Sequence, residues 1–184
     1  FKKKEVRQAL YQAIDINAIQ KKVMRGLSEP AGIITFPGVT GYTKALDKRL
    51  PYDVDAAKKL LADAGYPDGF DVELRCPNDR YVNDEAICTA VVGMLGKIGV
   101  NVNLFSQTKS KHFKELKDNQ GDFYMLGWGV PTLDSHYVFH YLYESGASWN
   151  KVNFSNSDVD AAIRVMEGEV DLDKRNAAIA TAWK

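Results

Sequence analysis

The sequence predicts an α/β fold in which a parallel β-α-β crossover is flanked by helices, and three observations support it. Residues 70–77, FDVELRCP, alternate apolar and polar side chains, as a strand with one exposed face does. Residues 83–99 carry apolar side chains at helical spacing and end on glycine. Residues 100–106, VNVNLFS, alternate again. Strand, helix and strand at this spacing predict a right-handed parallel crossover.

Helices with marked ends precede the crossover. The segment VRQALYQAI places its apolar residues on one face, and Asp15 can cap a second helical segment that ends at Gly26. A further helix starts at Asp53 or Asp55 and ends at Gly65. The glycine- and proline-rich stretch between these helices has no sustained period, which predicts a long ordered connection.

The region after the crossover predicts one more strand and more helix. A short helix around residues 111–118 leads to DFYMLGW, residues 122–128, an almost unbroken apolar run. Such a run is typical of a strand covered on both faces, so we expect it at the centre of a mixed sheet. Residues 155–184 are helical, with Ser157 and Asp160 spaced as a capping box.

Composition limits the classes of partner. Lys plus Arg and Asp plus Glu are 24 each, and the only basic run is Lys2 to Lys4, so nucleic acid is excluded as an expected partner. No stretch approaches the roughly 20 apolar residues of a membrane span. A hydrophobic content of 45% with 26% charge predicts one globular unit over residues 1–184. The charged start and the helical end predict a fragment of a longer protein.

The two cysteines, Cys76 and Cys88, have no metal-type spacing with each other or with a histidine. Cys76 occupies an apolar position of a predicted strand, and Cys88 lies in the first turns of the next helix. Two small buried thiols are the favoured interpretation, and a disulfide is the alternative.

Five collinear blocks of sequence carry a resemblance to a known family. In order they are VRQALYQAIDINAI with VMRGLSEPA, YDVDAAKKLLADAGYPDGF, GMLGKIGVNVNL, DFYMLGWG and LDKRNAAIATAW. They resemble the C-terminal lobe of the extracytoplasmic solute-binding proteins that serve peptide and nickel ABC importers.

The resemblance implies one lobe of a type II periplasmic-binding-protein-like fold. A small or peptide-like ligand would be enclosed between this lobe and an N-terminal lobe, then delivered to a membrane permease. It implies no cofactor and a periplasmic or extracytoplasmic location, with or without a lipid anchor. The N-terminal lobe and the strands that return to the hinge have no counterpart in this sequence.

The stretch around Trp128 is one candidate wall of the ligand site. In open α/β sheets, ligands bind beyond the carboxyl ends of the strands, where DFYMLGW ends. Trp128 would supply a flat apolar surface, and Gly129 would let the backbone approach a ligand. A purely core role for Trp128 is the alternative. Relatives in the resembled family carry an aspartate three residues after this tryptophan that holds the ligand's ammonium group, and here that residue is Pro131.

Asp134 and Arg80 are the charged candidates. Asp134 is three residues beyond Pro131 and either replaces the missing acid or caps a helix. Arg80 follows a strand end, where some dipeptide-binding relatives have an arginine that binds the ligand carboxylate in a bidentate geometry. The alternative is a solvated loop arginine paired with Asp79 or Asp84. Tyr81 and Asn83 are weaker candidates for the same wall.

No catalytic constellation is evident, so the chain is predicted not to be an enzyme. His136 and His140 are four residues apart, but HYVFH lacks the glutamate of zinc-protease helices and no third ligand is evident, so no metal site is predicted. No serine lies in a nucleophile elbow. Nothing in the spacing of Asp134 and Glu144 favours a glycosidase pair over chance. The alternative function is a sensing or interaction module of the same fold within a regulatory protein.

Overall fold

The structure is a computed structural model that describes residues 1–184. The chain forms two compact units. The sheet unit comprises Phe1–Pro30 and Leu50–Gly127, and the helical unit comprises Ala31–Arg49 and Trp128–Lys184. The sequence predicts a single lobe over residues 1–184, and the assignment of both units to one ligand-binding lobe stays a prediction.

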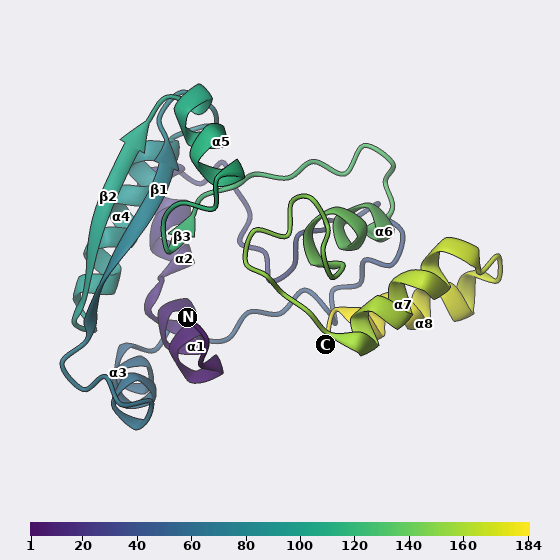
Figure 1. Ribbon diagram of the computed structural model, residues 1–184, viewed down its shortest axis with the longest axis horizontal. Helices are drawn as coiled ribbons and strands as arrows, with labels where there is room; N and C mark the ends of the chain where they lie inside the picture. The colour runs from purple at the N-terminus through teal and green to yellow at the C-terminus, as the bar shows by residue number, and fades with distance from the viewer. The chain divides into compact units, whose positions relative to one another are not determined.

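The sheet unit contains all three strands and most of the predicted helices (Figure 1). Its elements in chain order are α1 (Lys4–Ala13), α2 (Ile16–Ala18), the π-helical turn η1 (Ile19–Val23), α3 (Val54–Asp63), β1 (Phe70–Pro77), α4 (Asp84–Gly96), β2 (Val100–Gln107), α5 (Lys109–Lys117) and β3 (Phe123–Tyr124). The helices before the crossover start where the sequence predicts. Asp15 accepts a hydrogen bond from the Ala18 N–H, and Asp53 accepts one from the Ala56 N–H.

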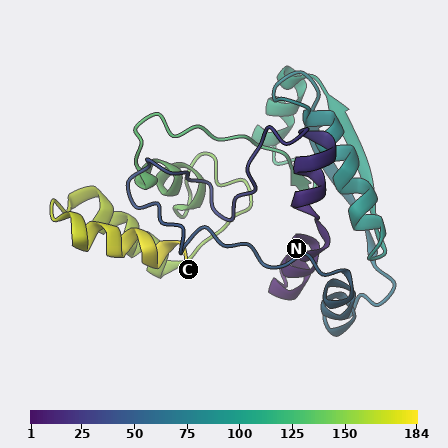
Figure 2. The same ribbon diagram turned by 180° about the vertical axis from the view of Figure 1, so that it is seen from behind.

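The three strands are parallel, in the order β2-β1-β3. The register runs from Phe70 beside Val100 to Pro77 beside Gln107. The α/β class and the β-α-β crossover are therefore confirmed, with α4 against one face of the sheet (Figures 1 and 2). The sheet is parallel throughout, whereas the sequence predicts a mixed one.

The position predicted for DFYMLGW is wrong. Only Phe123 and Tyr124 form a strand, β3 lies at the edge, and β1 occupies the centre. Both side chains are half-buried, because β3 pairs with one neighbour and offers only two residues to it. An apolar run indicates that its side chains are buried, but it does not indicate how many strands flank it.

Two glycines set the start of the β1-β2 pair. Gly69 and Gly99 precede the strands with φ of 77° and 81°, in the left-handed region that glycine adopts without strain. A Cβ atom on Gly69 would overlap the backbone carbonyl group of Gly99. This close backbone approach fixes the register with which the two strands begin.

The alternation predicted for β1 fails at one position. Arg75 belongs to the expected exposed face but is only 8% exposed. Its guanidinium lies 3.8 Å from the centre of the Phe105 ring and forms ion pairs with Glu73 at 2.7 Å and Glu115 at 3.4 Å. These partners come from β2 and α5 as well as β1, so a pattern within one strand could not indicate them.

The favoured interpretation of the cysteines is also wrong. Cys76 and Cys88 form a disulfide, with their Cα atoms 6.5 Å apart, and both are buried. The bond joins the end of strand β1 to the second turn of α4, so it closes a chain loop that contains residues 77–87. Leu74 packs with the two cysteines, as does the half-buried Met125.

The helical unit is built from α6 (Ser135–Val138), the π-helical turn η2 (Phe139–Tyr143), α7 (Ser157–Gly168) and α8 (Leu172–Ala182). Asn156, rather than Ser157, caps α7 by accepting the N–H groups of Asp158 and Val159. The predicted capping box is therefore wrong, since Asp160 instead accepts a hydrogen bond from the Ser145 N–H. The core of this unit consists of Phe139, Val159, Ala162, Ile163, Met166 and Ile179.

Residues 31–49 add a connection without helix or extended strand, as predicted from their glycine and proline content. Thr40 docks this connection on the start of α6: its N–H donates to the Leu133 carbonyl, and its carbonyl accepts from the N–H and hydroxyl of Ser135. None of the helices has the length and apolar character needed to cross a membrane.

Candidate ligand-binding site

The loop after β1 is organised around a buried carboxylate. Asp84 is 4% exposed, and its Oδ2 accepts the backbone N–H groups of Arg80 and Tyr81, each at 2.9 Å. Its Oδ1 accepts the N–H of Glu85. Burial opposes the charge on this carboxylate, but these hydrogen bonds outweigh it and hold the Asp84 pKa below its usual value. The charge on Asp84 thus shapes the loop that carries Arg80.

Arg80 projects from this loop into solvent. Its guanidinium carbon lies 5.2 Å from the centre of the Tyr81 ring. No ion pair joins it to Asp79, which accepts the Lys109 N–H, or to Asp84, which is used by backbone groups. Arg80 is thus a solvated loop arginine, as the alternative predicts, but it has no ion pair with either acid. The loop is held by its backbone while the guanidinium stays without an acidic partner.

Tyr81 and Asn83 have contacts within the sheet unit. The Tyr81 hydroxyl donates to the Gly127 carbonyl at 3.4 Å, and a Cβ on Gly127 would lie 2.6 Å from the Tyr81 ring. Asn83 adopts φ of 56° directly before α4, and its Nδ2 donates to the Val23 carbonyl at 3.0 Å. The amide of Asn83 therefore joins the loop to the end of η1.

Trp128 lies in an aromatic cluster of the helical unit. Its ring centre is 6.0 Å from those of Tyr137 and Tyr141, and 5.9 Å from that of Trp149. The side chain is half-buried, yet its indole Nε1–H is removed from solvent and has no acceptor in the protein. A buried donor without a partner is unfavourable. A Cβ on the adjacent Gly129 would meet no atom within 4 Å, so that position is open.

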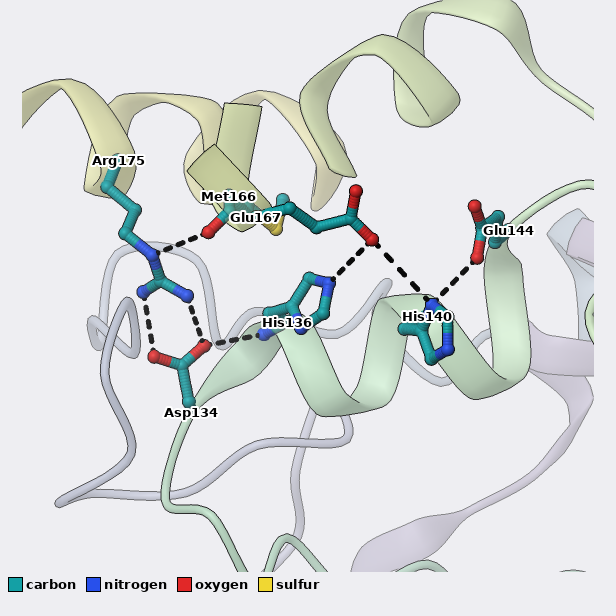
Figure 3. A network of polar contacts seen from close by, with 7 residues as sticks. All are labelled: Asp134, His136, His140, Glu144, Met166, Glu167 and Arg175. Carbon is teal, nitrogen blue, oxygen red and sulfur yellow. Dashed lines mark hydrogen bonds and ion pairs between the residues drawn. The ribbon is translucent and has the colours of Figure 1, made fainter. Parts of the chain in front are cut away.

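The carboxylate of Asp134 is occupied by hydrogen bonds within the protein. It accepts the His136 N–H at 2.8 Å and so caps α6, as the alternative prediction states. Both its oxygens also accept from Arg175, at 2.7 and 2.8 Å, while Arg175 Nε donates to the Met166 carbonyl (Figure 3). Burial raises the Asp134 pKa, but the hydrogen bonds from Arg175 and His136 outweigh it and lower the pKa overall. The carboxylate is already neutralised by a guanidinium.

One polar cluster contains a residue that sequence analysis missed. Glu167 of α7 lies against His136 and His140, although 27 residues separate it from the nearer histidine (140 to 167). No local pattern links an acid on one helix to two histidines on another. Only the packing of α7 against α6 and η2 brings them together.

Comparison with known proteins decides the family. The family described as bacterial extracellular solute-binding proteins, family 5 Middle, matches residues 1–150. The chain belongs to this family. Among its relatives, heme-binding protein A of Haemophilus influenzae is 28% identical over 179 residues, which cover 93% of this chain and 32% of that protein. The dipeptide-binding protein of Escherichia coli is 30% identical over 154 residues, covering 82% of this chain and 29% of the relative.

Solved structures agree with this assignment. The dipeptide-binding protein from Pseudoalteromonas sp. SM9913, in complex with Met-Leu, has a TM-score of 0.84 and 28% identity. The match covers 97% of this chain and 36% of that one. The resemblance found in the sequence is thus confirmed, including the type of α/β fold. This family 5 chain spans about a third of the length of the curated relatives it matches.

Proposed function

We propose that this family 5 chain belongs to the solute-binding component of an ABC import system. That component captures a small peptide-like ligand between two lobes and delivers it to a membrane permease without breaking a bond. Family membership supports a binding role, and the dipeptide-binding relatives support a peptide-like ligand. The Cys76–Cys88 disulfide supports a periplasmic or extracytoplasmic location, because disulfides persist in oxidising compartments.

The observation that carries the proposal is the state of Arg80. Its backbone is fixed by a buried carboxylate, while its guanidinium has no acidic partner. A fixed arginine of this kind suits the carboxylate of a ligand, because the planar guanidinium donates two parallel hydrogen bonds to it. The Tyr81 ring next to the guanidinium adds an apolar surface.

Trp128, in the helical unit, is a separate candidate. Its half-buried ring would give a peptide-like ligand a flat apolar surface. Gly129 would let that ligand approach the backbone, since nothing of the protein fills the space at its Cα. Asp134 is the least suited of the candidates, because an ammonium group would have to displace Arg175 from a bidentate pair.

The test is calorimetric titration of the purified protein that contains this chain, with Met-Leu and with the same dipeptide amidated at its carboxyl end. Enclosure between the two lobes would bury a pair between Arg80 and the ligand carboxylate. Removing one partner of such a buried pair costs about 2 to 5 kcal/mol of binding free energy, so we expect Arg80→Ala to lose that much for Met-Leu. Arg80→Lys should recover part of the loss. Arg164→Ala, which removes an exposed arginine of α7, is the matched control and should bind as wild type does.

The amidated dipeptide separates the arginine's role from a general effect. Wild type should bind it more weakly than Met-Leu, and Arg80→Ala should bind both forms equally. Equal binding of Met-Leu by wild type and Arg80→Ala would refute the assignment of Arg80. Mass spectrometry of the protein as purified identifies a co-purified ligand, and a ligand without a carboxylate would contradict the peptide-like assignment.

A further inference from the structure

Two histidines lie side by side on the helical segment made of α6 and η2. The rings of His136 and His140 are stacked, with centres 5.5 Å apart and an angle of 23° between their planes. Their side chains are 27% and 44% exposed, although His140 Nδ1 itself is covered by neighbouring atoms. Figure 3 shows a ring nitrogen of each histidine turned toward the same carboxylate on α7.

That carboxylate is Glu167. Its Oε1 lies 3.4 Å from His136 Nε2 and 4.0 Å from His140 Nδ1. On the other side, Glu144 Oε2 lies 2.8 Å from His140 Nδ1. One ligand atom from each of His136, His140 and Glu167 lies within 4.8 Å of the others. With metal–ligand bonds of about 2.1 Å, two ligand atoms on one ion lie about 3 to 4 Å apart. A small rotation of exposed side chains therefore brings all three to bonding distance.

The backbone beneath this cluster is held in place by other contacts. Asp134 caps the helix that carries His136, and Arg175 binds Asp134 through two hydrogen bonds. Arg175 also donates to the carbonyl of Met166, the residue directly before Glu167 (Figure 3). The start of α6 and the end of α7 are therefore joined through a single guanidinium. Only side-chain rotation is needed to assemble the cluster.

The chemistry of the cluster selects a class of ion. Imidazole nitrogens with carboxylate oxygens suit Zn²⁺, Ni²⁺ and Cu²⁺, whereas Mg²⁺ and Ca²⁺ prefer ligand sets made of oxygen alone. Two carboxylates and two neutral imidazoles carry a charge that a divalent ion balances. The exposure of the side chains leaves coordination positions for water.

We propose that His136 Nε2, His140 Nδ1 and Glu167 Oε1 bind one divalent transition-metal ion, with Glu144 as the fourth ligand. The site is independent of the proposed peptide-like ligand, which uses none of these side chains. A bound ion would join η2 to α7 directly and so add a cross-link to the helical unit.

The test uses the protein that contains this chain, with any affinity tag removed and after treatment with a chelator. Titration with ZnCl₂ and with NiCl₂ should give one ion per chain, and MgCl₂ and CaCl₂ should not compete. Glu167→Gln, which keeps the size of the side chain, and His140→Ala should each weaken binding about tenfold or more, since each removes a ligand. Asp158→Asn, which removes another exposed carboxylate from α7, is the matched control and should bind as wild type does.

Circular dichroism establishes whether each variant is folded. If His140→Ala is not folded, Glu167→Gln alone serves as the test. The thermal midpoint of wild type should rise with ZnCl₂, and that of Glu167→Gln should rise less. Absence of Zn²⁺ and Ni²⁺ binding by wild type overturns the proposal. Unchanged affinity in folded Glu167→Gln does so as well. Neither result bears on the peptide-like ligand, because no peptide is present in the titration.

Discussion

Removing the disulfide should lower the stability of the protein by an amount that the length of its loop sets. Cys76 and Cys88 are 12 residues apart in sequence. For a loop of this length, the cross-link lowers the entropy of the unfolded chain by about 9.5 cal/mol/K, which is about 2.8 kcal/mol at 25 °C. Both cysteines are buried, and alanine keeps their Cβ atoms, so the loss of packing is limited to the two sulfur atoms. We therefore expect the Cys76→Ala/Cys88→Ala double variant to lose about 3 kcal/mol of unfolding free energy.

The assay is urea unfolding followed by circular dichroism, at neutral pH, on wild type and on the double variant. Wild type unfolded and refolded in a strong reductant gives a second measurement, because it retains both sulfur atoms without the bond. If the cross-link is responsible, reduced wild type and the double variant should have similar free energies of unfolding. A difference below about 0.5 kcal/mol between oxidised wild type and the double variant would refute the reasoning. If the double variant loses unfolding free energy and reduced wild type does not, the effect comes from packing.

Two further predictions concern the sheet unit, and a third compares Gly127 of that unit with Gly129 of the helical unit. Asp84→Asn should cost about 1 to 3 kcal/mol of unfolding free energy at neutral pH. Because the Asp84 pKa is lowered on folding, wild type should lose this contribution as pH falls below about 4, and the urea midpoint of the variant should change less over that range. Burial lowers the pKa of His112, despite its hydrogen bond to a backbone carbonyl. The unfolding free energy of wild type should therefore fall as pH drops below about 6.5, and His112→Gln should abolish this pH dependence in the same assay. Gly129→Ala should leave the thermal midpoint unchanged, whereas Gly127→Ala should lower it, because the added methyl group meets the ring of Tyr81. Equal midpoints for the two glycine variants would contradict the packing described for that ring.

Much of the fold was predictable because its signals are local. Asp15 and Asp53 cap helices, and Gly65 adopts φ of 91° beyond α3, so each helix boundary is determined by a few neighbouring residues. The crossover was predictable for a similar reason, since alternation and helical spacing are properties of single segments.

The errors arise where neighbours from elsewhere in the chain decide. The edge position of β3 depends on which strands pair, and the burial of Arg75 depends on Phe105 and Glu115. Choosing between a disulfide and two thiols required the distance between a strand end and a helix, which two isolated patterns do not contain.

The candidate site, like the fold, was predictable only in part. Arg80 was identified from its place after a predicted strand end and from an arginine at a similar position in dipeptide-binding relatives, and its ligand role stays a prediction. The commitment of Asp134 to Arg175 was not visible, since 41 residues separate them. Glu167 was missed as a neighbour of the two histidines because it lies on a different helix.

The contact between Gly69 and Gly99 has a consequence for how this protein can evolve. Every nucleotide change that alters a glycine codon to another amino acid adds a side chain, and at Gly69 even a methyl group overlaps the backbone of the neighbouring strand. Sliding β1 along β2 by one residue, about 3.3 Å, would relieve the overlap only by turning the buried side chains of β1 to the opposite face of the sheet. Selection at Gly69 therefore acts on the absence of a side chain, through the packing of two backbones.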